Sequence, residues 1–414
     1  MKDHHSTLSS DESRTIITRI IANLPNVGKQ RNTFIAHILC LFLLIRGRRN
    51  FTNAARYGFH TEAVYRRAFA EPFDWLSFNT ALATEHGGDK TIIVFDPSFL
   101  PKSRKKTVHV GTFWSGSSGK ALHGLEIGCL AAVDRGRATA LHLEAVQTPN
   151  TAELKERGRT LTDHYAEVII DRKKWLERLS KYLVVDGYFA KHTFFDRILG
   201  ETHLHVVTKL RNDADLRYLY EGIARERGRP RRFDGKVDWS ALPHDRWETV
   251  DHNEDTRLLS ALLWSPSFKR TMRVIVVQEM HDGMPKRYVV LCSTDTTLPA
   301  ADIFDCYTKR FQIEFLFRDA KQFAGLTHCQ ARSERKLHFH SNAALSAVSI
   351  AKVAHFFDAP ADTTTTYSLA DVGMAYFNEF FTKFFFARLD IEPKSQKIAA
   401  ALPSLLSFGL IHGR

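Results

Sequence analysis

Two short apolar runs in the middle of the chain each end in an aspartate. The run TIIVFD ends at Asp96, just before Pro97, and the run YLVVDG carries Asp186 just before a glycine. Continuous apolar runs of four to eight residues that are bounded by turn residues are typical of buried strands. The pattern predicts strands at 91–96 and 182–187, each with a carboxylate at the rim of a sheet.

The segments around these runs predict a mixed sheet flanked by helices. LEIGCLAAVD and ATALHLEAVQT have the composition of strands that pair across a turn at Arg135–Gly136, and HLHVVTKL predicts one more strand. The segment 150–180 predicts a long helical stretch, and 188–199 predicts a second helix. The order strand, hairpin, helix, strand, helix, strand is that of an α/β domain.

The chain on either side has different patterns. Residues 1–85 predict a helical N-terminal domain, and 213–295 alternates in short stretches that predict a β-rich insertion. Helical patterns resume at 296–360 and continue into a Phe-rich tail, 361–414, for which we expect either core packing or a subunit contact. The sheet is therefore expected to be built in two parts, 86–212 and 296–360.

Two short helices are predicted around Gly58. One spans about 51–57, and the other begins after Thr61, a residue type that often caps helices, and carries Arg66 and Arg67. Two short helices around a glycine turn fit a DNA-binding helix-turn-helix, and they fit an ordinary helical hairpin equally well. Arg66 and Arg67 are therefore candidate DNA-binding residues.

The segment YTKRFQIEFLFRDAK, 307–321, predicts a helix with two polar stripes. At about 100° per residue, one stripe consists of Tyr307, Arg310, Glu314 and Lys321. The other consists of Thr308, Gln312 and Asp319. An ordinary amphipathic helix has one polar face, so one stripe is expected to face water and the other a site. The alternative is a surface ion pair between Arg310 and Glu314. The phenylalanines between the stripes are expected to seat the helix on the sheet.

Composition indicates a soluble globular protein with a polyanionic partner. Lys and Arg number 58 against 46 Asp and Glu, a net charge of +12 over 414 residues. Such a balance favours nucleic acid as the partner. The longest apolar run, 34–45, is shorter than the roughly 20 residues that span a bilayer, and no signal peptide is visible. We therefore expect a cytoplasmic protein with no membrane partner, and five scattered cysteines fit free thiols.

Asp96, Asp186 and Glu314 together suggest metal chemistry. For one aspartate alone, a turn or a helix cap is the simpler interpretation. Two strand ends in one sheet can bring carboxylates within about 4 Å, where both ionise comfortably only beside a cation. Three carboxylates suit Mg²⁺ or Mn²⁺ better than zinc. Two such ions can activate water or a DNA 3′-hydroxyl for an in-line phosphoryl displacement, while Arg, Lys and Tyr beside them bind phosphates.

The same residues carry a resemblance to a known family. The spacing Tyr-x2-Arg-x3-Glu-x6-Lys is similar to the YREK signature of DDE insertion-sequence transposases, which move by cut-and-paste. FDPSF around Asp96 and VVDGYF around Asp186 resemble that family's first two acidic blocks. The separations, 186 − 96 = 90 and 314 − 186 = 128 residues, also fit. The resemblance covers about residues 90 to 345.

The resemblance implies an RNase H-like core, with a mixed five-stranded sheet and a β-rich insertion. Asp96, Asp186 and Glu314 would be catalytic and would bind two Mg²⁺ or Mn²⁺ ions, and Tyr307, Arg310 and Lys321 would hold the transposon-end strand. In the family a Trp on the last strand of the insertion stacks on a flipped base. Tyr288 takes that place here, which leaves open whether a hairpin intermediate forms. The implied partners are double-stranded DNA, as transposon ends and target, and a second copy in a synaptic homodimer.

Further candidate DNA-binding residues are basic. Lys120 lies in FWSGSSGKALHGLEIG, a Gly/Ser-rich stretch expected to be a flexible loop near DNA, without the Walker GK[ST] of a nucleotide site. Lys209 and Arg211 lie at the end of the HLHVVTKL strand. The segment RGRP, 227–230, resembles a minor-groove hook, with a solvated loop as its alternative.

Three functions remain open at this point. The chain is expected to be a transposase that cleaves inverted-repeat ends and joins the 3′-hydroxyls to target DNA. A metal-dependent nuclease or resolvase on the same core would only hydrolyse DNA. A non-catalytic DNA-binding protein descended from a transposase would do neither, and it could lose a carboxylate without penalty.

Overall fold

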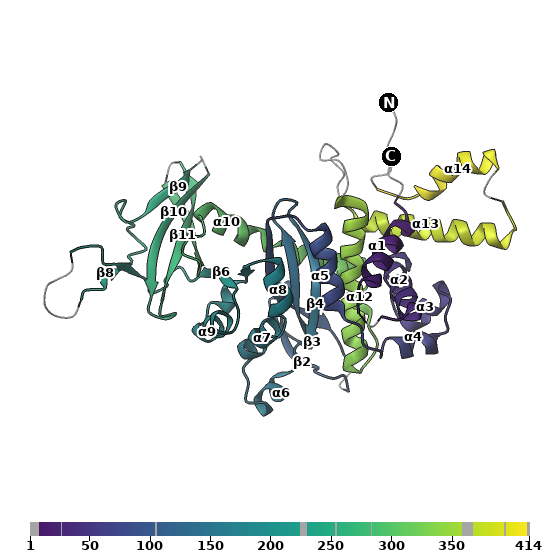
Figure 1. The fold of residues 1–414 in the computed structure, drawn as a ribbon, viewed down its shortest axis with the longest axis horizontal. Helices are drawn as coiled ribbons and strands as arrows, with labels where there is room; N and C mark the ends of the chain where they lie inside the picture. The colour runs from purple at the N-terminus through teal and green to yellow at the C-terminus, as the bar shows by residue number, and fades with distance from the viewer. Residues whose placement is uncertain are drawn as a thin grey trace.

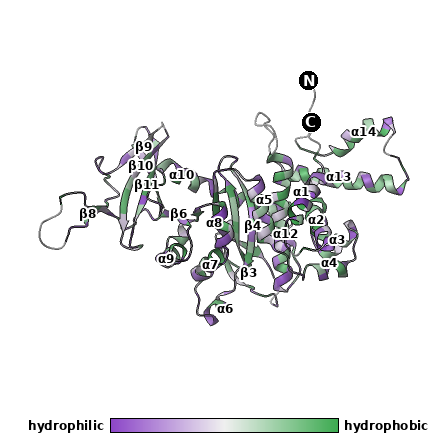
Figure 2. Cartoon of the chain, viewed as in Figure 1, coloured by the Kyte–Doolittle hydropathy of each residue, from purple (hydrophilic) through white to green (hydrophobic). Residues whose placement is uncertain are grey.

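The computed structural model describes residues 8–25, 27–103, 106–223, 230–252, 255–282, 284–357, 367–392 and 395–411. Figure 1 shows a central sheet with helices on both sides, a β-rich lobe at one end and a helical region at the other. Figure 2 shows hydrophobic residues along the central strands.

The described residues of the N-terminal region form α1 (Ser10–Ala22), α2 (Lys29–Leu44), α3 (Phe51–Tyr57), α4 (Glu62–Ala68) and α5 (Trp75–His86). The apolar run at 34–45 is the buried part of α2, which packs on α1, α12 (Glu334–Lys352) and α13 (Leu369–Arg388). The predicted helix pair around Gly58 is confirmed as α3 and α4, with Thr61 at the N-cap of α4. Among the described residues, no helix is both long and apolar enough to cross a membrane.

The strands around Asp96 form the middle of a 12-stranded sheet. β1 (Thr91–Pro101) lies between the antiparallel β3 (Lys120–Asp134) and the parallel β5 (Tyr182–Val184). β4 (Thr139–Gln147) pairs antiparallel with β3, and β6 (His205–Leu210) pairs parallel with β5. The predicted mixed sheet flanked by helices is therefore confirmed.

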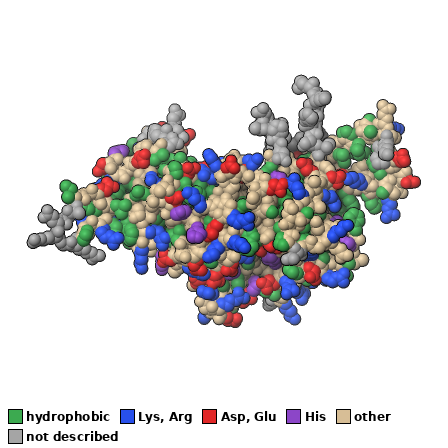
Figure 3. All heavy atoms as spheres, in the orientation of Figure 1, with side chains coloured by type: hydrophobic (Ala, Val, Ile, Leu, Met, Phe, Trp, Pro, Cys, Tyr) green, Lys and Arg blue, Asp and Glu red, His purple; other side chains and the backbone are tan. Residues whose placement is uncertain are grey.

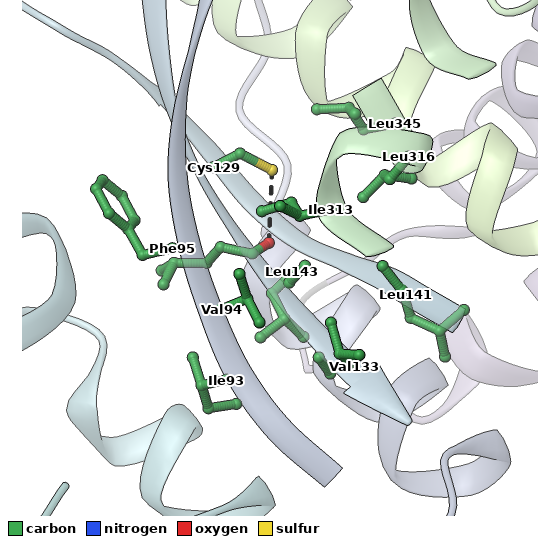
Figure 4. Close-up of a cluster of buried hydrophobic side chains, with 14 of the residues drawn as sticks. Ile93, Val94, Phe95, Cys129, Val133, Leu141, Leu143, Ile313, Leu316 and Leu345 are labelled. Atoms are coloured by element: carbon green, nitrogen blue, oxygen red, sulfur yellow. Dashed lines mark hydrogen bonds between the residues drawn. The ribbon is translucent and has the colours of Figure 1, made fainter. Parts of the chain in front are cut away.

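The two faces of β1 pack against different helices. On one face Phe95 contacts Tyr165 of α7 (Leu161–Ile170) and Phe189, with ring centroids 5.4 and 5.7 Å away. On the other face Cys129, the β3 partner of Asp96, lies with Ile313 of α11 (Gln312–Gln322) and neighbouring apolar side chains (Figure 4). Asp96 is thus held in a strand that is fixed from both sides.

Two local predictions near Asp96 are wrong. β1 does not end at Asp96 but continues through Pro97. Its pairing with β5 stops at Val94, so Pro97, which has no N–H to donate, lies where β5 no longer pairs. The Gly/Ser-rich stretch expected to be a loop is a hairpin of β2 (Gly111–Ser115) and β3, joined by η1 (Gly116–Ser118).

The long helical stretch predicted at 150–180 is three helices: α6 (Thr151–Glu156), α7 and α8 (Lys173–Leu179). Gly158 has φ +62°, a conformation that favours glycine and ends the first helical segment. Thr160 then starts α7 with a capping box that includes Asp163. The predicted helix after the Asp186 run is confirmed as η2 (Gly187–Phe189) followed by α9 (His192–Glu201).

The β-rich pattern predicted at 213–295 is confirmed, and it continues the central sheet. Its strands are β7 (Arg217–Leu219), β8 (Phe233–Lys236), β9 (Glu248–His252), β10 (Thr256–Ser265), β11 (Arg270–His281) and β12 (Met284–Ser293). β12 pairs antiparallel with β6 and so joins the lobe to the central strands. Of the RGRP segment, only Pro230 is among the described residues.

The single helix predicted at 307–321 is divided between α10 (Ala300–Lys309) and α11. At the junction the Ile313 N–H donates to the Arg310 carbonyl (3.2 Å) and the Glu314 N–H to the Phe311 carbonyl (3.0 Å). These i→i−3 bonds are tighter than those of an α-helix. The chain therefore keeps helical hydrogen bonds through the junction, but Tyr307 belongs to α10 and Glu314 to α11.

The side chains of α11 also depart from the prediction. Phe311 and Phe315 do not seat the helix on the sheet, because they are 48% and 44% exposed. Ile313 and Leu316 take that place. Asp319, expected on a water-facing stripe, is buried and bonds to Arg318 (3.0 Å).

After η3 (Leu326–His328), the buried α12 and η4 (Val353–Phe357), the Phe-rich tail forms α13 and α14 (Gln396–Leu406). The first half of α13 is core, with Tyr376 buried and bonded to Ser13 (2.6 Å). Its second half exposes Phe381, Phe384 and Phe385, and Figure 1 shows it extending from the body.

Candidate active site

Asp96 lies where the sheet opens. Because β5 pairs with β1 only at Ile93 and Val94, the β5 side of β1 is free of strand pairing at Asp96. The side chain is 18% exposed. Burial raises the pKa of the Asp96 carboxyl to about 7, with further upward contributions from nearby carboxylates and an opposing one from Arg310.

Asp186 follows β5 and caps η2. Its carboxylate accepts a hydrogen bond from the Tyr188 N–H (2.9 Å), and its carbonyl accepts one from the Thr208 hydroxyl (2.8 Å). The capping interpretation offered for a lone aspartate is therefore true of Asp186. It remains half-buried and lies near Asp96, whose pKa its charge raises.

Glu314 lies in the first turn of α11 and is linked to Asp96 through Arg310. The Arg310 guanidinium is 3.1 Å from a Glu314 oxygen and 3.6 Å from an Asp96 oxygen. Arg310 is only 6% exposed, and its Nε has no hydrogen-bond partner. One buried cation therefore sits between two of the three carboxylates.

Tyr307 and Lys321 flank this arrangement on opposite ends of the segment. The Arg310 guanidinium lies 5.8 Å from the centre of the Tyr307 ring. The Lys321 amine donates to the Ser98 hydroxyl of β1 at 2.9 Å. Burial lowers the pKa of Lys321, while the charge of Asp96 opposes that shift.

Two clefts meet at these residues. The larger, of about 1300 Å³, is lined by all three carboxylates and by Lys321. The smaller, of about 790 Å³, is lined by Tyr307 and Arg310 and by three other predicted DNA-binding residues: Lys209, Arg211 and Tyr288. Asp186 and Tyr188 line both clefts.

Some predicted DNA-binding residues are already engaged or lie elsewhere. The Tyr288 ring is stacked on Trp239 (16° between planes) and its hydroxyl donates to the Asn212 carbonyl (3.1 Å). Arg211 is paired with Asp213 (2.8 Å). Lys120, Arg66 and Arg67 line neither cleft. On the face in Figure 3, Lys and Arg are spread over the lobe and the body among Asp and Glu.

Sequence reasoning missed a fourth carboxylate, Glu126 of β3. It is 5% exposed, lines the larger cleft and accepts a hydrogen bond from the Tyr165 hydroxyl. Burial raises the pKa of Glu126, and its charge helps to raise that of Asp96. A single Glu inside the apolar strand LEIGCLAAVD was the only signal in the sequence.

Comparison with known proteins identifies the family. The family model described as "Transposase DDE domain" matches residues 87–350, well over half of the chain. The chain belongs to this DDE transposase family. The match covers β1, β5 and α11, so Asp96, Asp186 and Glu314 all lie inside the transposase domain.

Among solved structures, the transposase is similar to the one titled "Cryo-EM structure of piggyBac transposase synaptic complex with hairpin DNA (SNHP)". The identity is 11%, the TM-score is 0.38, and the match covers 99% of this chain and 84% of the other. No curated protein sequence matches this chain.

The transposase domain offers carboxylate oxygens that can bind a divalent ion, but these oxygens are not arranged around one metal position. Carboxylate oxygens suit Mg²⁺ and Mn²⁺, and a bound cation would offset the burial and the carboxylate repulsion that together raise the pKa of Asp96. Over the described ranges, no three His, Cys, Asp or Glu side chains are grouped closely enough to hold a metal. Arg310 occupies the space between Asp96 and Glu314.

Asp96 is expected to make the stability of the protein depend on pH when divalent ions are chelated. The pKa of Asp96 in the fold, about 7, is above the unfolded value of about 3.9. Between these two pH values the carboxyl is protonated in the native state and ionised in the unfolded state. We expect the stabilising effect of that proton to be lost as the pH rises through about 4 to 7. In EDTA, the melting temperature of the wild type should fall between pH 5 and pH 8. The melting temperature of Asp96→Asn should fall less over the same range. Equal slopes for the two proteins would contradict the burial of this carboxyl.

Proposed function

We propose that this chain is a cut-and-paste transposase of the insertion-sequence type with a YREK signature. It binds terminal inverted repeats, cleaves each end by hydrolysis and joins the freed 3′-hydroxyl to target DNA. The observation that carries the proposal is the Arg310 contact. Through it Asp96 and Glu314, 218 residues apart in sequence (314 − 96), lie beside one guanidinium, and both line the larger cleft.

An RNase H-like core is part of the proposal. In its support, the central strands lie in the order β4-β3-β1-β5-β6, with β1, β5 and β6 parallel and β3 antiparallel to β1. β3 is long and pairs with β1 on one edge and with β4 on the other. The helix that carries Glu314, α11, packs on the face of the sheet where the Cys129 side chain lies. The β-rich lobe would be the insertion that precedes the catalytic Glu.

We assign Asp96, Asp186 and Glu314 as the ligands of Mg²⁺ or Mn²⁺. When bound, such ions supply a charged template that activates the attacking oxygen and stabilises the leaving one. For Glu314 to serve as a ligand, Arg310 has to move away from it. The smaller cleft, which Arg310 already lines, is the space where its guanidinium can bind a DNA phosphate instead.

We assign DNA contacts to the smaller cleft and to the α3–α4 pair, and a subunit contact to α13. Tyr307, Arg310, Lys209 and Arg211 would bind the phosphates of the transposon-end strand along the smaller cleft. The α3–α4 pair with Arg66 and Arg67 is a candidate reader of the ends. The exposed phenylalanines of α13 are a candidate contact in a synaptic homodimer, where apolar side chains would be covered.

A strand-transfer assay tests the proposed function. The substrate is a duplex with the inverted repeats that flank the coding sequence, already cut to expose the 3′-hydroxyl, with a labelled plasmid as target and Mg²⁺ present. A transposase joins the two DNAs. Hydrolysis without joining would favour the nuclease, and binding with neither reaction would favour the non-catalytic protein.

Arg310→Gln should lower the rate of end cleavage by about a hundredfold, the typical effect of losing one charged donor at a reacting group. Glutamine keeps the length of a hydrogen-bonding side chain but cannot neutralise a phosphate. Single-turnover cleavage of a labelled end measures the effect. Arg197→Gln, which removes ion pairs to Glu201 and Glu167 and lines neither cleft, is the control and should cleave normally.

A further inference from the structure

The backbone pairing that joins the strands of Asp96 and Asp186 stops before either aspartate. β1 and β5 pair as far as Val94 and Val184. Beyond them, the Asp186 carbonyl accepts a hydrogen bond from the Thr208 hydroxyl, which ties this aspartate to β6. The distance between the two aspartates therefore depends on the side chains that pack between β1 and the turn after β5.

Three aromatic rings pack between these two segments on the α7 side of the sheet. Phe95 comes just before Asp96 and points away from the α11 side of β1 (Figure 4). Phe189 lies in η2, the turn that follows Asp186. The centroid of the Tyr165 ring is 5.4 Å from that of Phe95 and 5.5 Å from that of Phe189. All three rings are buried, so one tyrosine contacts both aspartate-bearing segments.

The Tyr165 ring is held in place through its hydroxyl. This hydroxyl donates a hydrogen bond to the Glu126 carboxylate of β3, and both side chains are buried. Burial and the charge of Glu126 raise the pKa of Tyr165, so the hydroxyl keeps its proton and remains the donor. Tyr165 is therefore fixed at both ends, with its ring between Phe95 and Phe189 and its hydroxyl on β3.

Gly128 gives the Phe95 ring room to lie against β3. It follows Glu126 by two residues, so the two residues belong to the same face of the strand. A Cβ at Gly128 would lie 2.7 Å from the Phe95 ring, and any side chain would therefore displace that ring. The Glu-x-Gly sequence at 126–128 thus places an acceptor for Tyr165 beside the room for Phe95.

A carboxylate is a costly acceptor at this place. Glu126 is 5% exposed and its partner is a neutral hydroxyl, whereas an uncharged acceptor would leave no charge to bury. After burial and the charges of Asp186 and Glu314, the charge of Glu126 also contributes to the raised pKa of Asp96. Hydrogen bonds to ionised groups are about twice as strong as those between neutral groups. A carboxylate here therefore holds the tyrosine firmly at a cost in stability, which indicates a need for position.

We propose that the Tyr165–Glu126 pair positions the two metal-binding aspartates. By fixing the Tyr165 ring against both segments, the pair sets the separation at which Asp96 and Asp186 can share a divalent ion. Tyr165 and Glu126 act through the aspartates and are positioning residues. This inference rests on the proposed function, which makes the aspartates metal ligands, and it adds the residues that orient them.

Mn²⁺ binding to the protein with a cleaved transposon end tests this role. Electron paramagnetic resonance of the free ion gives the Mn²⁺ affinity, and a gel shift gives the affinity for the end. Tyr165→Phe keeps the ring but loses the hydroxyl bond, so Mn²⁺ binding should weaken by about tenfold with unchanged affinity for DNA. The Mg²⁺ concentration that gives half-maximal cleavage should rise by the same factor, and saturating Mg²⁺ should restore most of the rate.

Tyr376→Phe is the matched control. It removes the hydroxyl of another buried tyrosine, which is bonded to Ser13 (2.6 Å) and lines neither cleft. This variant should bind Mn²⁺ as wild type does. An equal loss of Mn²⁺ affinity in Tyr376→Phe and Tyr165→Phe would overturn the inference, because any lost buried hydroxyl would then have the same effect.

Changes at Glu126 separate position from charge. Glu126→Ala should weaken Mn²⁺ binding as much as Tyr165→Phe does, and the double variant should lose no more, because all three remove the same bond. Glu126→Gln keeps an oxygen that accepts from the Tyr165 hydroxyl, so it should retain most of the Mn²⁺ affinity. A Gln variant as weak as the Ala variant would overturn the inference, since the charge rather than the bond would then matter.

The outcomes distinguish this inference from the proposed function. A Tyr165→Phe protein that melts at a lower temperature but binds Mn²⁺ like wild type would overturn the positioning role and leave the transposase in place. A wild type whose Mn²⁺ affinity is unchanged by Asp96→Asn would overturn both, because Asp96 would then not be a metal ligand.

Discussion

Glu314→Gln is expected to lower Mg²⁺-dependent end cleavage by about a thousandfold while DNA binding persists. Glutamine has nearly the same shape but one weaker oxygen donor and no charge, so it holds a divalent ion poorly. The charge stabilisation that such ions supply is several kcal/mol, and about 4 kcal/mol corresponds to a factor of about a thousand. Glu314 is 46% exposed, so the loss of folding stability should be small.

The same loss is expected for Asp96→Asn and Asp186→Asn. Cleavage of a labelled end in Mg²⁺, beside a gel-shift measurement of DNA binding, separates chemistry from binding. Glu201→Gln, an exposed carboxylate of α9 outside both clefts, is the control and should cleave at the wild-type rate. Full activity in any one of the three variants would remove that residue from the site.

Asn342→Leu is expected to lower the free energy of unfolding by about 3 kcal/mol. The Asn342 side chain accepts from His142 (2.9 Å) and from the Ala145 N–H (2.8 Å), and it donates to the Ala145 and His338 carbonyls (both 2.9 Å). It therefore satisfies the backbone of β4 where that strand faces α12. Leucine fills the volume but removes the side-chain partners of His142 and of the Ala145 N–H and carbonyl, all of which are buried.

Urea denaturation followed by circular dichroism measures this loss. Asn23→Ala, at the exposed C-cap of α1, should change stability by less than about 0.5 kcal/mol and serves as the control. His142 also contacts Cys129 (3.4 Å), so this network reaches the β3 residue that pairs with Asp96. A variant as stable as wild type would contradict the assigned role of this network.

The central strands could be predicted from the sequence because a buried strand appears there as a short run of apolar residues. TIIVFD and YLVVDG predicted β1 and β5, and the turn at Arg135–Gly136 predicted the β3–β4 hairpin. Pairing partners were not visible in these runs. The predicted end of β1 at Asp96 was therefore wrong. Pro97 is tolerated in the strand because β5 no longer pairs with β1 at that position, and the sequence does not show where β5 stops.

The α10–α11 segment shows how much of the candidate site could be predicted from residue spacing. Residue spacing indicated that Arg310 and Glu314 share a face, and their ion pair is present. Spacing could not indicate the i→i−3 junction at Phe311, because that junction depends on how two helices pack rather than on local propensity. Nor could it give the proximity of Asp96 to Arg310, which depends on the tertiary fold.

Anomalous scattering from Mn²⁺ in crystals of the protein with a cleaved transposon end shows directly whether the three carboxylates bind the metal. Peaks are expected between the carboxylates of Asp96, Asp186 and Glu314, with the Arg310 guanidinium withdrawn from Glu314 onto a DNA phosphate. Manganese bound elsewhere, or a DNA end bound while Arg310 still joins Asp96 to Glu314, would contradict this expectation.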